Sequence, residues 1–290
     1  MVYIQLQQSY TILKGEGILL LREKWDIVVV LDFLNIYAGL DECAKLDKVL
    51  PLVHTAPSRY AMKILKGMKL KRSVCNAFNG EKLLYFFYAR PAYRKIELDT
   101  SKDKSLFPVV FLVDSKHIDI KRVYPFDSGA YSIYTKTHLS DFGNRSDYEI
   151  LNQLRYIQLY IKAIFGNNQR YYDGLCNLGS ELPDIVSSQR EVKHDLDNLL
   201  NLIASANRAE IDDRCMTVEV QSPVDCKLSG KLLSVVVPSF YQNDQDFLKL
   251  MKKYGITPKY YKYFPRHRVN EVLGAVFSKV EEFYRDNNYF

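Results

Sequence analysis

Strand-like and helix-like segments are mixed along this 290-residue chain without strict alternation. Residues 27–31, 83–88 and 108–113 are apolar runs of strand length, whereas residues 148–164 and 191–206 carry apolar side chains at helical spacing. A doubly wound parallel sheet requires regular alternation, so the pattern favours an α+β fold. The 47% hydrophobic content suffices for a substantial core.

The same pattern predicts how the chain is divided. We expect residues 1–50 to form an N-terminal extension and residues 51–290 to form a single domain. Within that domain we expect a helical insert at about 145–210 and a C-terminal helix over 269–284.

Charge and cysteine usage limit the partners and the compartment. The formal net charge of +6 permits a nucleic-acid partner but does not require one, since no run of six like charges occurs. Five dispersed cysteines without a CxxC pair favour free thiols in a reducing compartment and argue against a structural zinc site. No apolar run is long enough to span a bilayer, and no signal peptide is visible. We therefore expect a cytoplasmic protein without a membrane partner.

The segment YFFYARPAYR, residues 85–94, combines aromatic rings with two arginines. Pro91 ends strand pairing behind Arg90. One interpretation is a core strand with an ion-paired arginine at its end; the other is a site for a planar, phosphate-bearing ligand. Strand alternation predicts that Tyr88 and Tyr93 line a cleft, and that Tyr85 and Phe87 face the core.

Two further groups of residues could carry chemistry. His54 and Thr55 end a predicted strand, and a short helix follows at 59–66, with Ser58 as its expected N-cap. Farther along, alternation places Glu219 on the same strand face as Thr217 and Gln221. A lone histidine is most often structural, and such a strand face can also simply be exposed to water.

The order of these three segments resembles the ADP-ribosyltransferase superfamily, and in particular its DarT-like members. The matching segments are His54-Thr55 with ILKG at 64–67, the aromatic stretch ending in Arg90, and Glu219 before a proline-containing turn. The resemblance implies a split antiparallel sheet, with NAD as co-substrate and Glu219 and Arg90 as catalytic residues. The residues that it implies for NAD binding are His54, Thr55, Tyr88, Tyr93 and Arg90.

The resemblance also implies a partner. The acceptor of ADP-ribose would be nucleic acid or, alternatively, protein, and such enzymes act as toxins or in antiviral defence. The family usually carries Gln or Glu two residues before its catalytic glutamate. Here that residue is Thr217, and Gln221 lies two residues after Glu219.

The chemistry agrees with these residue types. Cleavage of the nicotinamide–ribose bond passes through a cation like that of glycoside hydrolysis, which a carboxylate stabilises. An arginine such as Arg90 suits the pyrophosphate, with Arg94 as a second candidate. No GxGxxG motif indicates a Rossmann-type site, and the reaction requires no metal.

Two alternatives remain open from the sequence. Asp32 follows an apolar strand, as in PIN-like nucleases, and Asp114 after residues 108–113 is a second candidate ligand for a divalent metal. The aromatic–arginine segment could also form a nucleotide-binding module without catalytic activity.

Overall fold

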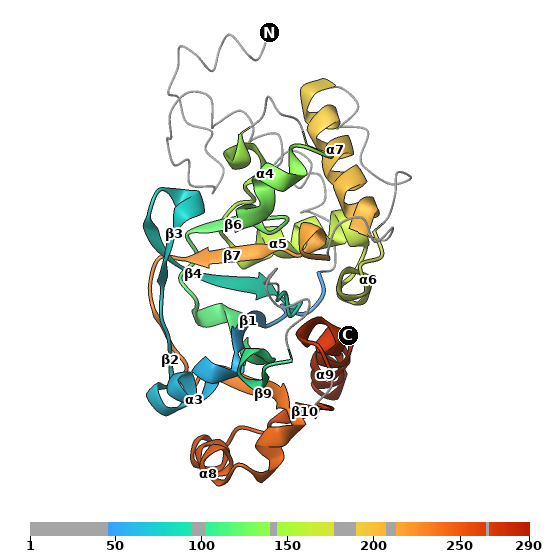
Figure 1. The fold of residues 1–290 in the computed structure, drawn as a ribbon. Helices are drawn as coiled ribbons and strands as arrows, with labels where there is room; N and C mark the ends of the chain where they lie inside the picture. Colours follow the sequence, from blue (N-terminus) through green and yellow to red (C-terminus); the bar gives the residue numbers. More distant parts are fainter. Residues whose placement is uncertain (1–45, 94–101, 140–143, 177–189, 207–212, 265–266) are drawn as a thin grey trace.

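The computed structural model describes residues 46–93, 102–139, 144–176, 190–206, 213–264 and 267–290 (Figure 1). The predicted N-terminal extension therefore lies almost entirely outside the described residues, as does Arg94. The strands are β1 (Leu52–Pro57), β2 (Lys69–Leu70), β3 (Ser73–Cys75), β4 (Glu81–Tyr88), β5 (Pro108–Val113), β6 (Arg122–Tyr124), β7 (Glu219–Ser222), β8 (Cys226–Lys227), β9 (Leu232–Pro238) and β10 (Lys259–Tyr261). The α-helices are α3 (Ser58–Gly67), α4 (Tyr131–Tyr134), α5 (Leu154–Phe165), α6 (Asn168–Asp173), α7 (Arg190–Ala206), α8 (Gln245–Tyr254) and α9 (Leu273–Asp286).

A mixed eight-stranded sheet organises the fold, which confirms the α+β class. Its order is β10-β9-β5-β1-β4-β7-β6, with β3 added beside β4, and a separate two-stranded sheet joins β2 to β8. The pair β9–β10 is parallel and the other pairs are antiparallel. Helices α5, α6 and α7 follow β6 in the sequence and lie near β6 and β7, while α3 packs on β1 and β5 (Figure 1).

The sheet is joined weakly at its middle. β1 pairs with β5 over six residues, but its register with β4 covers two, Leu52 with Tyr88 and Val53 with Phe87. Beyond that point the ring of His54 reaches β4, where its Nδ1 lies 2.9 Å from the carbonyl oxygen of Tyr85. The sheet thus consists of two halves, β10-β9-β5-β1 and β4-β7-β6, that separate after Val53.

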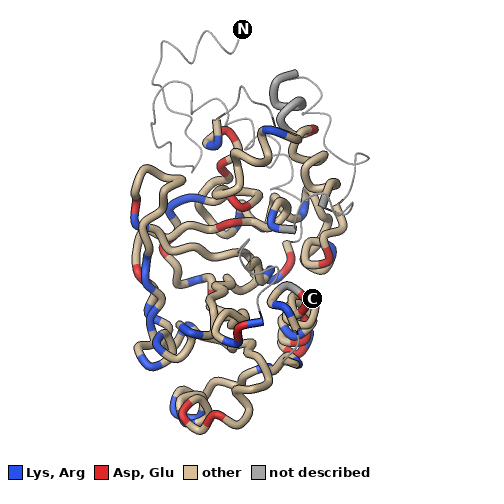
Figure 2. Tube along the Cα trace, viewed as in Figure 1, with Lys and Arg blue, Asp and Glu red and all other residues tan. Residues whose placement is uncertain are grey.

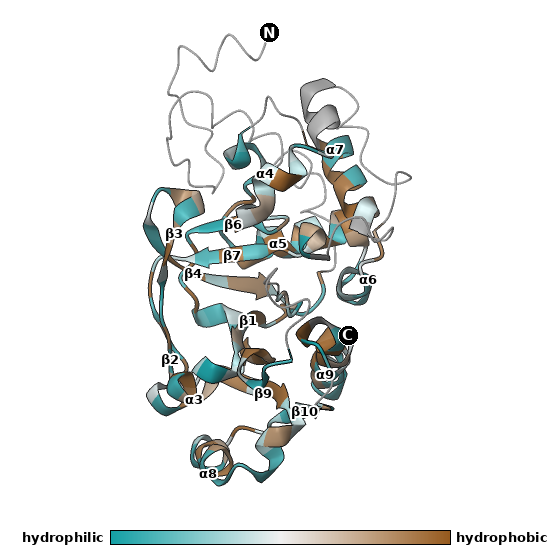
Figure 3. Cartoon of the chain, in the orientation of Figure 1, coloured by the Kyte–Doolittle hydropathy of each residue, from teal (hydrophilic) through white to brown (hydrophobic). Residues whose placement is uncertain are grey.

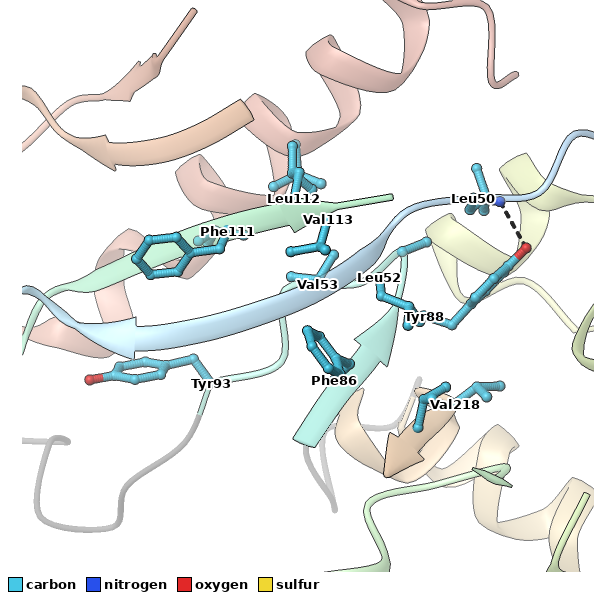
Figure 4. Close-up of a cluster of buried hydrophobic side chains, with 14 of the residues drawn as sticks. Leu50, Leu52, Val53, Phe86, Tyr88, Tyr93, Phe111, Leu112, Val113 and Val218 are labelled. Carbon is cyan, nitrogen blue, oxygen red and sulfur yellow. Dashed lines mark hydrogen bonds between the residues drawn. The ribbon is translucent and has the colours of Figure 1, made fainter. Parts of the chain in front are cut away.

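The core lies where these two halves meet and under the helices. The strands around β1, β5 and β9 are mainly hydrophobic, whereas α3 and β2 are more hydrophilic (Figure 3). Phe86, Tyr88 and Phe111 are completely buried in this core (Figure 4). The hydroxyl of Tyr88 accepts a hydrogen bond from the backbone N–H of Leu50 at 2.8 Å, which satisfies the polar end of a buried ring.

Among the described residues, no helix is both long enough and apolar enough to cross a membrane.

Candidate functional site

Glu219 lies at the start of β7, and its register defines which residues share its face of the sheet. It is paired with Phe87 of β4 on one side and with Tyr124 of β6 on the other. Two residues along, Gln221 is paired with Tyr85 and with Arg122. Directly opposite residues point to the same face, so aromatic rings flank this carboxylate on both neighbouring strands.

Three hydrogen-bond donors surround the Glu219 carboxylate, which is 1% exposed. The hydroxyl of Ser128 and the amide nitrogen of Gln221 donate to Oε1 at 2.6 and 2.8 Å. The backbone N–H of Ser128 donates to Oε2 at 3.2 Å. Ser128 begins a 3-10 turn, Ser128–Ala130, that follows β6, and Asp127 is its N-cap. The site is therefore built from two segments 91 residues apart.

Among the described residues, the Glu219 carboxylate lacks a countercharge. Within the described residues, no lysine, arginine or histidine forms an ion pair with it. The nearest cations are engaged elsewhere: Arg122 with Glu81 at 2.7 Å, and Arg214 with Asp127 at 2.5 Å. Buried charges in proteins are usually paired, so this carboxylate is unusual.

Burial, with a further contribution from the charge of Asp127, raises the pKa of Glu219 to about 8. The hydrogen bonds from Ser128 and Gln221 act in the opposite direction and favour the ionised form. Burial therefore makes the ionised form of this side chain more costly than that of an exposed glutamate, although the side chain is surrounded by donors suited to a carboxylate. A cation placed beside it would shift the balance towards ionisation.

A chain of polar contacts leads from the surface to Glu219. Glu81 accepts hydrogen bonds from Lys121 and from Arg122, both at 2.7 Å, and these contacts lower its pKa to about 2. Arg122 also donates from NH1 to the Oε1 of Gln221 at 3.0 Å. This contact fixes the amide orientation of Gln221, so that its NH₂ group points to Glu219 and Ser128.

The aromatic strand β4 differs from the sequence-based expectation. Tyr85 and Phe87 are partly exposed and share the face of Glu219, whereas Tyr88 is fully buried on the opposite face. The alternation is as predicted, but the assignment of the two faces is reversed. Tyr93 is 9% exposed and donates from its hydroxyl to the carbonyl oxygen of Leu106 at 2.7 Å, so it too belongs to the core.

Arg90 is also placed differently from the prediction. Its guanidinium, in a residue 3% exposed, donates from NH1 to the carbonyl oxygens of Tyr171 and Tyr172 in α6, at 2.9 and 3.0 Å. It also lies 5.4 Å from the ring centre of Phe277 in α9. The preceding residue, Ala89, has a left-handed φ of 60°, and its carbonyl oxygen accepts a hydrogen bond from the hydroxyl of Tyr284. Arg90 thus ties the end of β4 to two helices.

The two residues of the predicted strand end lie on opposite faces. His54 makes an edge-to-face contact with Phe86, at a centroid distance of 6.0 Å, and burial lowers the pKa of its ring. Thr55 alternates with it and shares the face of Val53 and Phe87. The Oγ1 of Thr55 is buried, and no described residue gives it a hydrogen bond. The hydroxyl of Thr55 is therefore an unsatisfied buried polar atom close to the point where β1 and β4 diverge.

The residues proposed for a nuclease do not form a site in the described part of the chain. Asp32 lies outside it. Asp114 is the N-cap of a 3-10 turn, where it accepts from the backbone N–H of Lys116 at 3.0 Å. The described residues contain no group of three histidine, cysteine, aspartate or glutamate side chains able to hold a metal ion.

Compared with protein-family models, with curated proteins and with solved structures, the chain matches none of them.

Sequence reasoning identified Glu219 and Gln221 but missed Ser128, Asp127 and Arg122. The segment FDSG at 126–129 carries one usable signal, because an aspartate followed by serine and glycine is typical of a capped turn. Nothing in the sequence connects that turn with a strand 91 residues later.

Proposed function

We propose that this protein is an NAD-dependent mono-ADP-ribosyltransferase in which Glu219 is the catalytic residue. The observation that carries the proposal is a buried carboxylate that is held by three donors and has no cation paired with it in the described part of the chain. The positive charge that develops on the ribose when the nicotinamide bond breaks would supply the missing countercharge.

The proposed reaction moves one group between two partners. The bond between the anomeric carbon and the nicotinamide nitrogen breaks, and its electron pair leaves with nicotinamide. A nucleophile of the acceptor forms the new bond to that carbon and releases its proton. The Glu219 carboxylate stabilises the cationic transition state and can then take that proton.

The divergence of β1 from β4 after Val53 is the basis for the proposed location of NAD. Phe87 and Tyr85 offer partly exposed rings on the face of Glu219, and Thr55 offers a buried hydroxyl without a partner in the described residues. His54 alternates with Thr55 on β1, and its Nδ1 lies 2.9 Å from the carbonyl oxygen of Tyr85 on β4. Arg90 acts in this proposal by holding the strand end, because its guanidinium donates to two carbonyl oxygens of α6. For the acceptor we propose nucleic acid, with protein as the alternative.

The test is nicotinamide release from labelled NAD by the full chain, followed by mass spectrometry of added DNA, RNA and protein. We expect release that persists in EDTA and is lost in Glu219→Gln, which preserves the shape of the side chain. Asp114→Asn is the matched control and should retain activity. Absence of NAD consumption with every acceptor, or full activity in Glu219→Gln, would overturn the proposal.

The pH profile adds a second readout. Because Glu219 must be ionised and its pKa is raised to about 8, kcat/KM for NAD should increase with pH up to about 8. A profile that is flat between pH 6 and 9 would argue against Glu219 as the ionising group.

A further inference from the structure

Two segments of this chain carry a large excess of positive charge and lie together in one corner of the described structure. Residues 58–82 and 223–231 together carry nine lysines and arginines against two acidic residues, a net charge of +7. The whole chain carries +6, so the remaining residues sum to −1. Lysines and arginines gather along α3, β2 and the chain leading to β3 (Figure 2).

The structure brings these two segments together through the small sheet of β2 and β8. Lys69 is paired directly with Lys227 in that sheet, an arrangement of like charges that costs stability. One carboxylate, that of Asp225, forms ion pairs with both Lys69, at 2.8 Å, and Arg72, at 3.2 Å. Hydrogen bonds from Arg72 and Lys69 lower the pKa of Asp225, so it remains charged at any physiological pH.

Several cations of this corner lack an acidic partner in the part of the chain that the structure describes. Lys63, Lys71 and Lys227 are exposed, and the described residues give none of them an acidic partner. Lys66 approaches Asp246 at 3.9 Å, with both side chains more than 60% exposed. A corner with an excess of exposed cations over acidic partners is suited to an external polyanion.

We propose that this basic corner, formed by α3, β2 and β8, binds the phosphate backbone of nucleic acid. The ring of Tyr60 on α3 is 47% exposed, with the guanidinium of Arg59 4.9 Å from its centre, and it is available to stack on an unpaired base. A membrane surface fits less well, because the apolar side chains Ala61 and Leu65 of α3 are buried in the protein and cannot insert into lipid.

The basic corner is connected to Glu219 by a short stretch of chain. Cys226, the first residue of β8, lies seven residues after Glu219, which limits their separation to about 25 Å. The role of this corner as a docking surface for the acceptor depends on the proposed transferase function. Binding of nucleic acid to the corner does not depend on that function, so the binding proposal and the transferase proposal can be refuted separately.

The experiment is fluorescence anisotropy with a labelled single strand of about 20 thymidines, between about 50 and 200 mM salt. The variant Lys63→Glu/Lys71→Glu/Lys227→Glu is compared with Lys102→Glu/Lys136→Glu/Lys253→Glu, which changes the same charge at exposed lysines elsewhere. We expect the first variant to lose affinity and to lower the slope of log K against log salt by about two, and the second to retain the slope. Thermal melting of each variant verifies folding.

Equal losses in the two variants, or wild-type binding that does not depend on salt, would overturn the proposal. So would tighter binding to phosphatidylserine vesicles than to the single strand. Tyr60→Ala should weaken single-strand binding about tenfold and leave binding of a duplex unchanged, and equal effects on both would refute the stacking role. Nicotinamide release measured in parallel separates the two proposals, since a protein that binds the strand but consumes no NAD would retain this inference and lose the transferase.

Discussion

The two faces of strands β4 and β7 carry opposite chemistry on the same backbone. One face presents Phe86, Tyr88 and Val220, which are all fully buried in the apolar core. The other face presents Glu219 and Gln221 beneath a serine turn, beside the partly exposed rings of Tyr85 and Phe87. We infer that packing on the apolar face keeps the two strands rigid. That rigidity holds the Glu219 carboxylate, which is costly to bury, in place on the other face.

The largest expected effect on the free energy of unfolding comes from truncating a ring on the apolar face. Phe86→Ala removes a fully buried ring and should lower the free energy of unfolding by about 3–5 kcal/mol. Phe87→Ala, its neighbour on the polar face, is partly exposed and should cost clearly less. Urea denaturation measures both, and equal losses would mean that the two faces are packed alike.

On the polar face, Glu219→Gln should lower nicotinamide release by about 100-fold or more. It should also change how stability depends on pH. The folded pKa of about 8 lies above the unfolded value of about 4.5, so the native state retains a proton that the unfolded chain has lost. The contribution of Glu219 to stability should therefore be greatest below pH 4.5 and fall as pH rises towards 8, by at most about 1.4 kcal/mol per pH unit.

Urea denaturation at pH 6, 7 and 8 measures that slope, and the glutamine variant should lack this contribution. The same slope in both proteins would show that Glu219 is not the group that retains the proton.

Removing the hydroxyl of a tyrosine on each face of β4 should have smaller effects on stability, and these should also differ between the faces. Tyr88→Phe leaves the buried N–H of Leu50 without its acceptor and should cost about 1–3 kcal/mol. Tyr85→Phe removes a hydrogen bond to the sulfur of Cys75 at a partly exposed position and should cost less than about 1 kcal/mol. Thermal melting ranks the two, and a larger loss for Tyr85→Phe would reverse the assignment of the faces.

The smallest effect concerns the orientation of one amide. Arg122→Met frees Gln221 to turn its oxygen towards Glu219, which should raise the pKa of Glu219 further, by about half a unit. Arg145→Met is the matched control. The guanidinium carbons of Arg122 and Arg145 each lie 4.7 Å from the ring centre of Phe78, so both variants lose that stacking contact. The hydrogen bond to Gln221 is donated by Arg122, so the Arg122 variant removes it. Titration of ¹³C-labelled glutamate carboxyls by NMR reads the pKa directly, and the same shift in both variants would point to lost stacking as its cause.

Local elements could be predicted from the sequence because their signals are local. The apolar run at 108–113 is β5, and the helix after Asp244 is α8, where Asp244 accepts from the N–H of Phe247 at 3.0 Å as an N-cap. Ser58 shows where local rules lose to tertiary contacts. It was the expected cap of α3, but its hydroxyl donates to the carbonyl oxygen of Phe107 at 2.8 Å instead.

The site could be predicted only in part. Alternation showed that Glu219 and Gln221 share a face, but it could not show which face the helices cover. Tyr88 was therefore expected to line a cleft, whereas it is fully buried and Tyr85 and Phe87 are partly exposed. The partners Ser128 and Arg122 come from pairing of β6 with β7, a contact that depends on the whole topology. The contact of Arg90 with α6 could not be predicted for a similar reason, because α6 lies more than 75 residues later in the chain.

The hydrogen bond from Tyr284 to the carbonyl oxygen of Ala89 has a consequence for synthesis. These residues are 195 positions apart, so at 5–20 residues per second the end of β4 leaves the ribosome about 10 to 40 seconds before its partner is made. Throughout that interval β4 lacks its contact with α9. The nascent chain must therefore remain protected for most of its translation, and completion of α9 is the step that ends this exposure.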